Sequence, residues 1–204
     1  MDPVSPILYS TERLYAREIV REDADGVFEY AGDIENSGYM SWSPLSYERA
    51  LLFIEQCLAS QIESPRRRYR LALCRKEDDA FIGTVTLTLD DELRQGSVGY
   101  ILIKSHWHCG YASEAVRGLL TFAFLGLDLH RITAACDDKN SASVRVMESV
   151  GMRREAHQIK SVYGTVFGKK GWRSLYQYAM LQKEFLCGLA DGYYSPDGSD
   201  QNRN

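Results

Sequence analysis

The sequence predicts a mixed α/β protein in which helices flank a central sheet. Runs of alternating or continuous apolar residues recur along the 204 residues and are typical of strands. A strand-like run leads into an amphipathic helical pattern around Trp107 to Ala115, and a second strand and helix follow this pair. We expect a single domain over residues 1–187, because this length buries a sizeable core, and a flexible polar tail over residues 188–204.

The first half of the chain predicts two helices and four strands. Acidic residues after Val20 favour the start of the first helix, since they interact well with the positive end of the helix dipole. Ser46 is expected to cap the second helix, because apolar residues recur at helical spacing after it. A polar, aromatic loop at 36–44 separates the two helices. The strands are expected at 13–19, 69–74, 81–89 and 96–103.

The second half predicts a strand–helix–strand–helix run followed by closing strands. An apolar stripe over residues 112–127 indicates an amphipathic helix. The short apolar strand at 132–136 suits a buried parallel position, and a helix follows at 140–150. Val162 and the stretch 174–181 supply the closing strands.

The composition excludes several classes of function. A net charge of −4 argues against general affinity for nucleic acid or an anionic membrane, so neither is expected as a partner. The basic cluster at 66–70 is interpreted as a solvated loop that enters a strand. Five cysteines without paired spacing favour reduced thiols in a cytoplasmic protein. His106, His108 and Cys109 lie too close together in one turn to converge on an ion, so no metal site is expected.

The turn between the predicted strand at 96–103 and the following helix carries the main chemical signal. It reads Trp-His-Cys-Gly-Tyr-Ala-Ser-Glu-Ala, and its backbone N–H groups at the start of a helix suit a bound phosphate. The chain has no Gly-Lys-Ser/Thr tripeptide, which a Walker loop requires. A single Gly110 also does not make the G-x-G-x-x-G fingerprint of dinucleotide-binding folds. Taken alone, this turn is equally compatible with a glycine that only eases a strand into a helix.

The turn resembles the Q/R-x-x-G-x-G/A coenzyme A loop of the GNAT acyltransferases, with Trp107 in the Q/R position. Eight further short matches occur in the order expected for this family, and together they resemble its Rim-type branch, which includes the ribosomal-protein N-terminal acetyltransferases. The matches are Thr11–Leu14, Trp42–Leu45, Ile82–Gly83, Val98–Tyr100, Gly110–Ala115, Leu129–Ile132, Asn140–Ser143, Met147–Met152 and Tyr178–Met180. The resemblance implies a mostly antiparallel sheet flanked by helices, with a splayed parallel pair of strands at the acetyl-CoA site.

The resemblance also assigns residues to acetyl-CoA, the expected co-substrate. The strand before the turn is expected to pair its backbone with the pantetheine arm, and the amides of the turn are expected to hold the pyrophosphate. Asn140 is expected to bind the coenzyme arm, with the Ser143 hydroxyl beside the sulfur, although both residues can equally be helix caps. The full set is Tyr100, Ile101, Leu102, His108, Cys109, Gly110, Tyr111, Ala112, Ser113, Asn140 and Ser143. His108 and Cys109 replace the Gly and Lys common in the branch.

Ser143 is the candidate catalytic residue. Many GNAT enzymes carry a Tyr acid seven residues after the Asn, and Met147 occupies that position here, so Ser143 is the best candidate donor to the leaving thiolate. The strand Glu of some relatives is replaced by Ala135, which leaves the general base open among three acids. These acids are Asp137, Glu35 and Glu155. Glu114 is interpreted as structural.

The acceptor is expected to be a primary amine, most simply the N-terminal α-amine of a protein or peptide. Tyr39, Trp42 and Trp172 are expected to shape its pocket. Ser174 stands where relatives often carry Asp, so a contact to a cationic acceptor is expected to be missing. Two alternatives stay open: a small-molecule amine as acceptor, or a non-catalytic acyl-CoA-binding module. The sequence does not distinguish a monomer from a homodimer.

Overall fold

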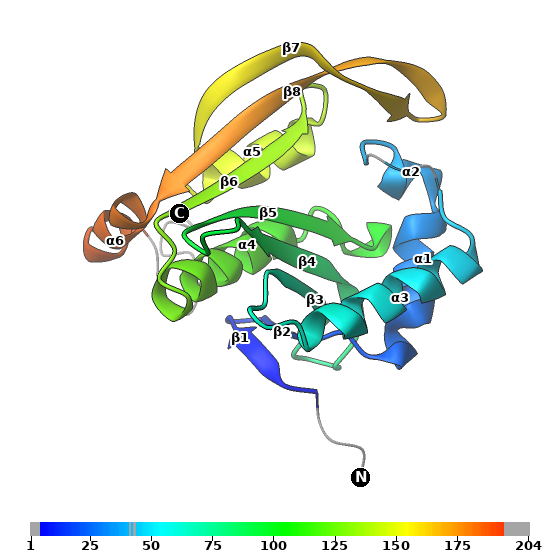
Figure 1. Cartoon of the computed structure of the whole chain (residues 1–204), viewed down its shortest axis with the longest axis horizontal. Helices are drawn as coiled ribbons and strands as arrows, with labels where there is room; N and C mark the ends of the chain where they lie inside the picture. Colours follow the sequence, from blue (N-terminus) through cyan, green and yellow to red (C-terminus); the bar gives the residue numbers. More distant parts are fainter. Residues whose placement is uncertain (1–4, 41, 43, 194–204) are drawn as a thin grey trace.

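A single mixed sheet forms the centre of the computed structural model, which describes residues 5–40, 42 and 44–193 (Figure 1). The strand order is β1-β2-β3-β4-β5-β6-β8-β7. The strands are β1 Ile7–Ser10, β2 Leu14–Glu18, β3 Arg68–Arg75, β4 Phe81–Leu89, β5 Gln95–Leu102, β6 Arg131–Asp137, β7 Arg153–Val166 and β8 Lys169–Leu181. Neighbours in this sheet are antiparallel except β5 and β6, which are parallel.

Helices cover both faces of the sheet. They are α1 Ala24–Gly32, α2 Ile34–Ser37, α3 Tyr47–Gln61, α4 Tyr111–Thr121, α5 Ser141–Ser149 and α6 Gln182–Ala190. Residues of α1 and α3 share one buried cluster with the sheet, whereas residues of α4 and α5 share the other. Side chains of β3 alternate between the two, with Leu71 and Leu73 facing α4 and Ala72 and Cys74 facing α1 and α3. The sequence-predicted mixed α/β fold is confirmed.

The parallel pair at the centre of the sheet separates after three residue pairs. The register runs from Gln95 opposite Arg131 to Ser97 opposite Thr133, and both strands then continue without pairing to each other. β5 keeps its partner β4 up to Leu102, and β6 keeps its partner β8. The predicted splay is therefore present, and it opens towards the turn that precedes α4.

Strands β7 and β8 form a long ribbon that arches from the sheet towards α2 (Figure 1). At its tip the Phe167 N–H donates a hydrogen bond to the Gly38 carbonyl at 3.1 Å. The Phe167 ring also lies over Gly38, where a Cβ atom would come within 2.2 Å of it. Gly38 is therefore a point of close approach that connects the ribbon to the end of α2.

Several elements differ from the sequence-based expectation. β1, α2 and α6 were not expected, and α2 lies inside the predicted loop at 36–44. β7 begins at Arg153 rather than near Val162, because its residues up to Tyr163 are exposed on an edge strand and show no buried alternation. α6 runs to Ala190 and so includes the first residues of the predicted tail. Residues 194–204 of that tail lie outside the described residues.

Candidate functional site

A cavity of about 770 Å³ lies where β5 and β6 separate, between the turn before α4, helix α5 and the end of α2. It contains most of the residues that the sequence predicted to bind acetyl-CoA. The lining residues are Glu35, Asn36, Tyr39, Met40, Tyr100, Ile101, Leu102, His106, Trp107, His108, Gly110, Tyr111, Ala112, Ser113, Asn140, Ala142, Ser143, Arg145, Val146, Ser149 and Phe167.

The β5 wall presents backbone groups to the cavity. Ile103 N–H donates to Ile82 of β4 at 2.9 Å, whereas the Gly96 carbonyl accepts from the Thr133 hydroxyl of β6 at 3.3 Å. Backbone polar groups alternate sides along a strand, so even-numbered residues from Gly96 onward face the β6 side. Beyond Ser97 that side is open. The N–H groups of residues 100 and 102 and the carbonyl of residue 100 therefore face the splay, as an extended ligand arm requires.

The end of β5 is fixed through one carbonyl. The Leu102 oxygen accepts from Trp107 Nε1 at 2.9 Å and from Asn36 Nδ2 at 3.0 Å. Asn36 is buried, and its Oδ1 has no hydrogen-bond partner among the described residues. Trp107, in the Q/R position of the predicted loop, thus uses its indole to hold the strand end that borders the turn.

The turn before α4 forms an amide-lined cradle. Gly110 precedes the helix with φ of +79°, and His108 has φ of +60°. The N–H groups of Tyr111, Ala112 and Ser113 are in the first turn of α4 and have no acceptor within the helix. Together with the helix dipole they suit a phosphate group. Amides at one end and a largely uncharged wall along β5 and α5 fit a ligand with a pyrophosphate and a neutral arm.

Glu114 holds this turn from behind. It is buried, and its carboxylate accepts from the Thr11 hydroxyl, the Arg13 backbone N–H and Arg13 Nε, each at 2.7 Å. Arg13 also donates to the Cys109 carbonyl at 3.0 Å. These hydrogen bonds agree with the structural interpretation of Glu114, because its carboxylate links the segment just before β2 to the start of α4.

Helix α5 supplies the opposite wall. Asn140 is its N-cap, and its Oδ1 accepts from the Ser143 N–H at 3.1 Å. Four further lining residues of α5 follow at i, i+3, i+4 and i+7 spacing and so share one helix face. They are Ala142, Arg145, Val146 and Ser149. Met147 points elsewhere and is 1% exposed in the core, so the position of the family's Tyr acid does not reach the cavity.

The cavity extends beyond β5 to a second group of residues around α2. Glu35, Tyr39 and Met40 line this end, and Phe167 reaches it from the ribbon tip. Tyr39 and Phe167 pack edge to face with ring centroids 4.9 Å apart. Of the lining residues in the described part of the chain, Glu35 is the only one with a carboxylate, and it forms an ion pair with Lys104.

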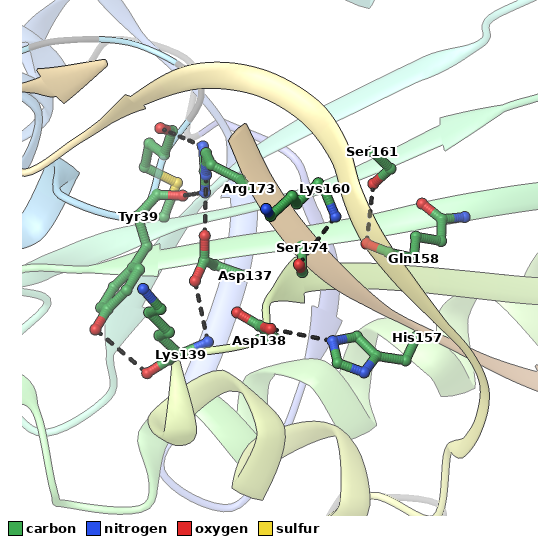
Figure 2. Close-up of polar contacts among 11 residues, drawn as sticks. Tyr39, Asp137, Asp138, Lys139, His157, Gln158, Lys160, Ser161, Arg173 and Ser174 are labelled. Carbon is green, nitrogen blue, oxygen red and sulfur yellow. Dashed lines mark hydrogen bonds and ion pairs between the residues drawn. The ribbon is translucent and has the colours of Figure 1, made fainter. Parts of the chain in front are cut away.

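Arg173 of β8 fixes the Tyr39–Met40 segment, as Figure 2 shows. Its Nε donates to Asp137 Oδ2 at 2.9 Å, and its Nη2 donates to the Tyr39 carbonyl at 2.7 Å. Nη1 donates to the Met40 carbonyl at 3.3 Å. The Arg173 and Asp137 side chains are only 8% and 3% exposed. One buried ion pair thus joins the end of β6, the middle of β8 and the segment after α2.

Some predicted residues do not meet at the cavity. The Cys109 side chain points away, with its thiol 3.3 Å from the Trp107 carbonyl. Trp42 does not line the cavity, and Trp172 is 63% exposed on the ribbon, where it packs against Tyr163. The assignment of Trp42 and Trp172 to an acceptor pocket stays a prediction that this geometry does not support.

The three acids left open as a general base are also separated. Asp137 is committed to Arg173, and Glu155 lies on β7, where it pairs with Arg131 and Arg153. Only Glu35 lines the cavity. Ser174 accepts from the Lys160 N–H at 3.0 Å and so belongs to the ribbon (Figure 2).

The sequence interpretation missed some lining residues. Asn36, Met40 and Phe167 come from elements whose contacts depend on the tertiary fold, and no local pattern identifies them. The α5 residues did carry a signal, because their helical spacing after Asn140 places them on the same face. Arg145 adds a positive charge to that face of the cavity, whereas positions 108 and 109 lack the Lys that is common in the branch.

Comparison with known proteins decides the family. Residues 13–153 match the family model described as "Acetyltransferase (GNAT) domain". The chain belongs to the GNAT acetyltransferase family. It is 30% identical over 179 residues to the uncharacterized N-acetyltransferase p20 of Bacillus licheniformis. The aligned region covers 86% of this chain and 96% of p20. It is 29% identical over 178 residues to the uncharacterized N-acetyltransferase YnaD of Bacillus subtilis, with coverage of 86% and 98%.

Solved GNAT structures share the fold. An acetyltransferase from Bacillus anthracis superposes with a TM-score of 0.76 at 26% identity and covers 88% of this chain and 100% of its own. Two others support the fold alone. Spermidine N-acetyltransferase from Vibrio cholerae, in complex with CoA and spermine, gives 0.73 at 20% identity, with coverage of 85% and 98%. Mycobacterium smegmatis RimJ, in complex with CoA-disulfide, gives 0.73 at 21% identity, with coverage of 92% and 93%.

This GNAT chain is an N-acetyltransferase, as its relatives are named. Within the described ranges, no helix combines the length and apolar content needed to cross a membrane. The same residues contain no cluster of three or more His, Cys, Asp or Glu side chains arranged to hold a metal ion.

Proposed function

We propose that the protein transfers the acetyl group of acetyl-CoA directly to a primary amine, and that this amine is the N-terminal α-amine of a protein or peptide, as in the Rim-type branch. One observation carries the proposal. Strand β5, the Gly110 turn that follows it and the start of α5, which comes later in the chain, line one cavity and contain most of the residues expected to bind the coenzyme.

In this proposal the amides from His108 to Ser113 hold the pyrophosphate, and the open side of β5 pairs with the pantetheine arm. The Asn140 oxygen is occupied by the helix cap, so its side-chain NH₂ is the group that can donate to the arm. Arg145 faces the same cavity and supplies the positive charge that His108 and Cys109 do not. A flexible Arg at an exposed position contributes modestly, so the amide cradle provides most of the phosphate contact.

The acceptor enters from the α2 side of the cavity, beside Glu35, Tyr39 and Phe167. Transfer forms a C–N bond and breaks a C–S bond, so the amine must lose a proton and the sulfur must be stabilised as a thiolate. The Glu35 carboxylate acts as the base that accepts the amine proton, directly or through a water molecule. The Ser143 hydroxyl donates a hydrogen bond to the sulfur. Holding both reactants in one cavity supplies much of the acceleration.

The charge of the lining favours a monoamine over a polyamine. Among the described residues, Glu35 is the single carboxylate in the lining, and Lys104 already neutralises it. A polyamine with several positive charges needs several acids, because desolvated charges bind well only when paired. An α-amine carries one charge and loses it before attack.

A panel of acceptors tests this function. The protein is incubated with acetyl-CoA and either peptides with free N-termini, the same peptides with blocked N-termini, or spermidine. Acetylated products are identified by mass spectrometry. We expect acetylation of free N-termini only. Exclusive acetylation of spermidine would move the function to small amines, and tight coenzyme binding without any product would support a non-catalytic module.

A further inference from the structure

The Tyr100 hydroxyl is a polar group in the cavity that the proposed function does not use. Tyr100 lies on β5 with its side chain on the α4–α5 face, and its hydroxyl donates to the Ser143 carbonyl at 3.3 Å. Hydroxyl donors usually lie at about 2.7–2.8 Å from an oxygen acceptor. The bond to Ser143 is therefore long and weak, and the hydroxyl can turn to a better acceptor.

The position of Tyr100 along β5 places it near the reactive end of a bound coenzyme. The open part of β5 runs from Val98 to Leu102, a length of about 13 Å for four residue steps. The Gly110 turn lies beyond its far end, and the pairing of Ser97 with Thr133 closes the near end. A coenzyme with its pyrophosphate on the turn and its arm along β5 brings its sulfur towards the closed end, beside Tyr100 and Ser143.

The environment keeps this hydroxyl protonated. Burial raises the pKa of Tyr100 to about 12. The phenol is therefore a hydrogen-bond donor throughout the neutral and mildly alkaline range. Met147, which occupies the position of the family's usual acid, lies in the core and has no proton to offer.

We propose that the Tyr100 hydroxyl, together with Ser143, donates a hydrogen bond to the coenzyme sulfur as the C–S bond breaks. This inference rests on the proposed function. The electron pair of the C–S bond passes to sulfur as the C–N bond forms. The amine nitrogen loses one proton, and the sulfur finally gains one from solvent. Tyr100 keeps its own proton and stabilises the negative charge, so it is unchanged after each turnover.

Binding of CoA and desulfo-CoA tests the inference without turnover. Titration calorimetry at pH 7 and pH 9 measures how much more tightly the protein holds CoA than the analogue that lacks sulfur. The CoA thiol ionises in alkaline solution, so its thiolate fraction is larger at pH 9 than at pH 7, and donors beside it should favour CoA more at the higher pH. We expect the Tyr100→Phe variant to lose roughly tenfold of this preference at pH 9, the effect of one hydrogen bond to a charged group.

Tyr9 provides a matched control. Its hydroxyl donates to the Ala115 carbonyl of α4 at 2.9 Å, and Tyr9 lies outside the cavity. Tyr9→Phe removes the same kind of tyrosine-to-helix bond, so it should lower the melting temperature and leave the CoA preference intact. An unchanged preference in Tyr100→Phe, with CoA still bound, would overturn this inference alone. Failure of the wild-type protein to bind CoA at all would overturn the proposed function and this inference together.

Discussion

Asn140 and Ser143 form one structural unit at the start of α5, because the Asn140 side chain caps the helix through the Ser143 N–H at 3.1 Å. The cap uses only the backbone of Ser143 and leaves its hydroxyl available. A role in capping and a role at the coenzyme are therefore compatible for both residues. Substitutions at the two positions should separate these roles.

Ser143→Ala should lower kcat while coenzyme binding stays nearly intact. The variant keeps the backbone N–H that Asn140 caps, and it loses only the hydroxyl that is proposed to contact the sulfur. We expect a fall in kcat of roughly 10- to 1,000-fold, the range for one donor to developing charge. Steady-state kinetics with a peptide acceptor measure this. Full activity would show that Ser143 is not the donor, and a collapse of coenzyme affinity would make it a binding residue instead.

The ion pair between Arg173 and Asp137 should control the acceptor end of the site. Arg173→Met removes the contacts that hold the Tyr39 and Met40 carbonyls, so kcat/KM for the acceptor should fall by roughly 10- to 100-fold. The KM for acetyl-CoA should stay unchanged in this variant. Arg17→Met breaks a comparable pair with Asp23 away from the cavity and serves as the control. It should lower stability without changing either KM, and equal effects of both variants on the acceptor would contradict the positioning role.

Thiol labelling tests whether the coenzyme binds at the Gly110 turn. All five cysteines are free, with Cys109 and Cys187 exposed and the other three buried. A thiol reagent should therefore label two positions in the native protein. Saturating acetyl-CoA, which has no free thiol to consume the reagent, should slow labelling of Cys109, which lies in the Gly110 turn, and leave Cys187 on α6 unaffected. Mass spectrometry of the labelled peptides checks this, and equal rates at Cys109 with and without acetyl-CoA would contradict the placement.

Stability should fall in alkali because of buried thiols. Burial raises the pKa of Cys57 and of Cys136 to about 11, well above the usual 9.0 of a cysteine thiol. A raised pKa in the folded state means that the unfolded chain loses its proton first. The stabilising contribution is therefore complete below about pH 9 and is lost as pH rises towards 11. Urea unfolding across this range measures the slope, and the Cys57→Ala, Cys136→Ala double variant should show a smaller one.

The sequence predicted the parts of the fold that local patterns encode. Gly110 marked the turn, and the recurring apolar residues of strand β5 before it and of helix α4 after it made both elements recognisable. The exposed edge strand β7 and the short α2 lacked such patterns. Their positions depend on contacts such as that between Phe167 and Gly38, which join residues far apart in the chain.

The sequence also predicted the coenzyme end of the candidate site better than the acceptor end. The residues expected to bind the coenzyme lie within a few residues of a turn or a helix start, and all of them except Cys109 line the cavity. At the acceptor end, Trp172 was expected to shape the pocket, but it lies exposed on the ribbon, and Phe167 lines the cavity instead. The curvature of a long hairpin decides which aromatic reaches the cavity. No pattern within the hairpin sequence indicates that curvature.

The central claim is that CoA binds on the Gly110 turn, and thermal unfolding with and without CoA tests it most directly. Gly110→Val places a branched side chain where the pyrophosphate should lie, and Gly192→Val is the matched control because Gly192 has a similar φ of +73° outside the cavity. Both variants should lose stability through backbone strain. CoA should raise the melting temperature of the wild-type protein and of Gly192→Val, and should leave Gly110→Val unchanged. An equal shift in Gly110→Val would contradict the account.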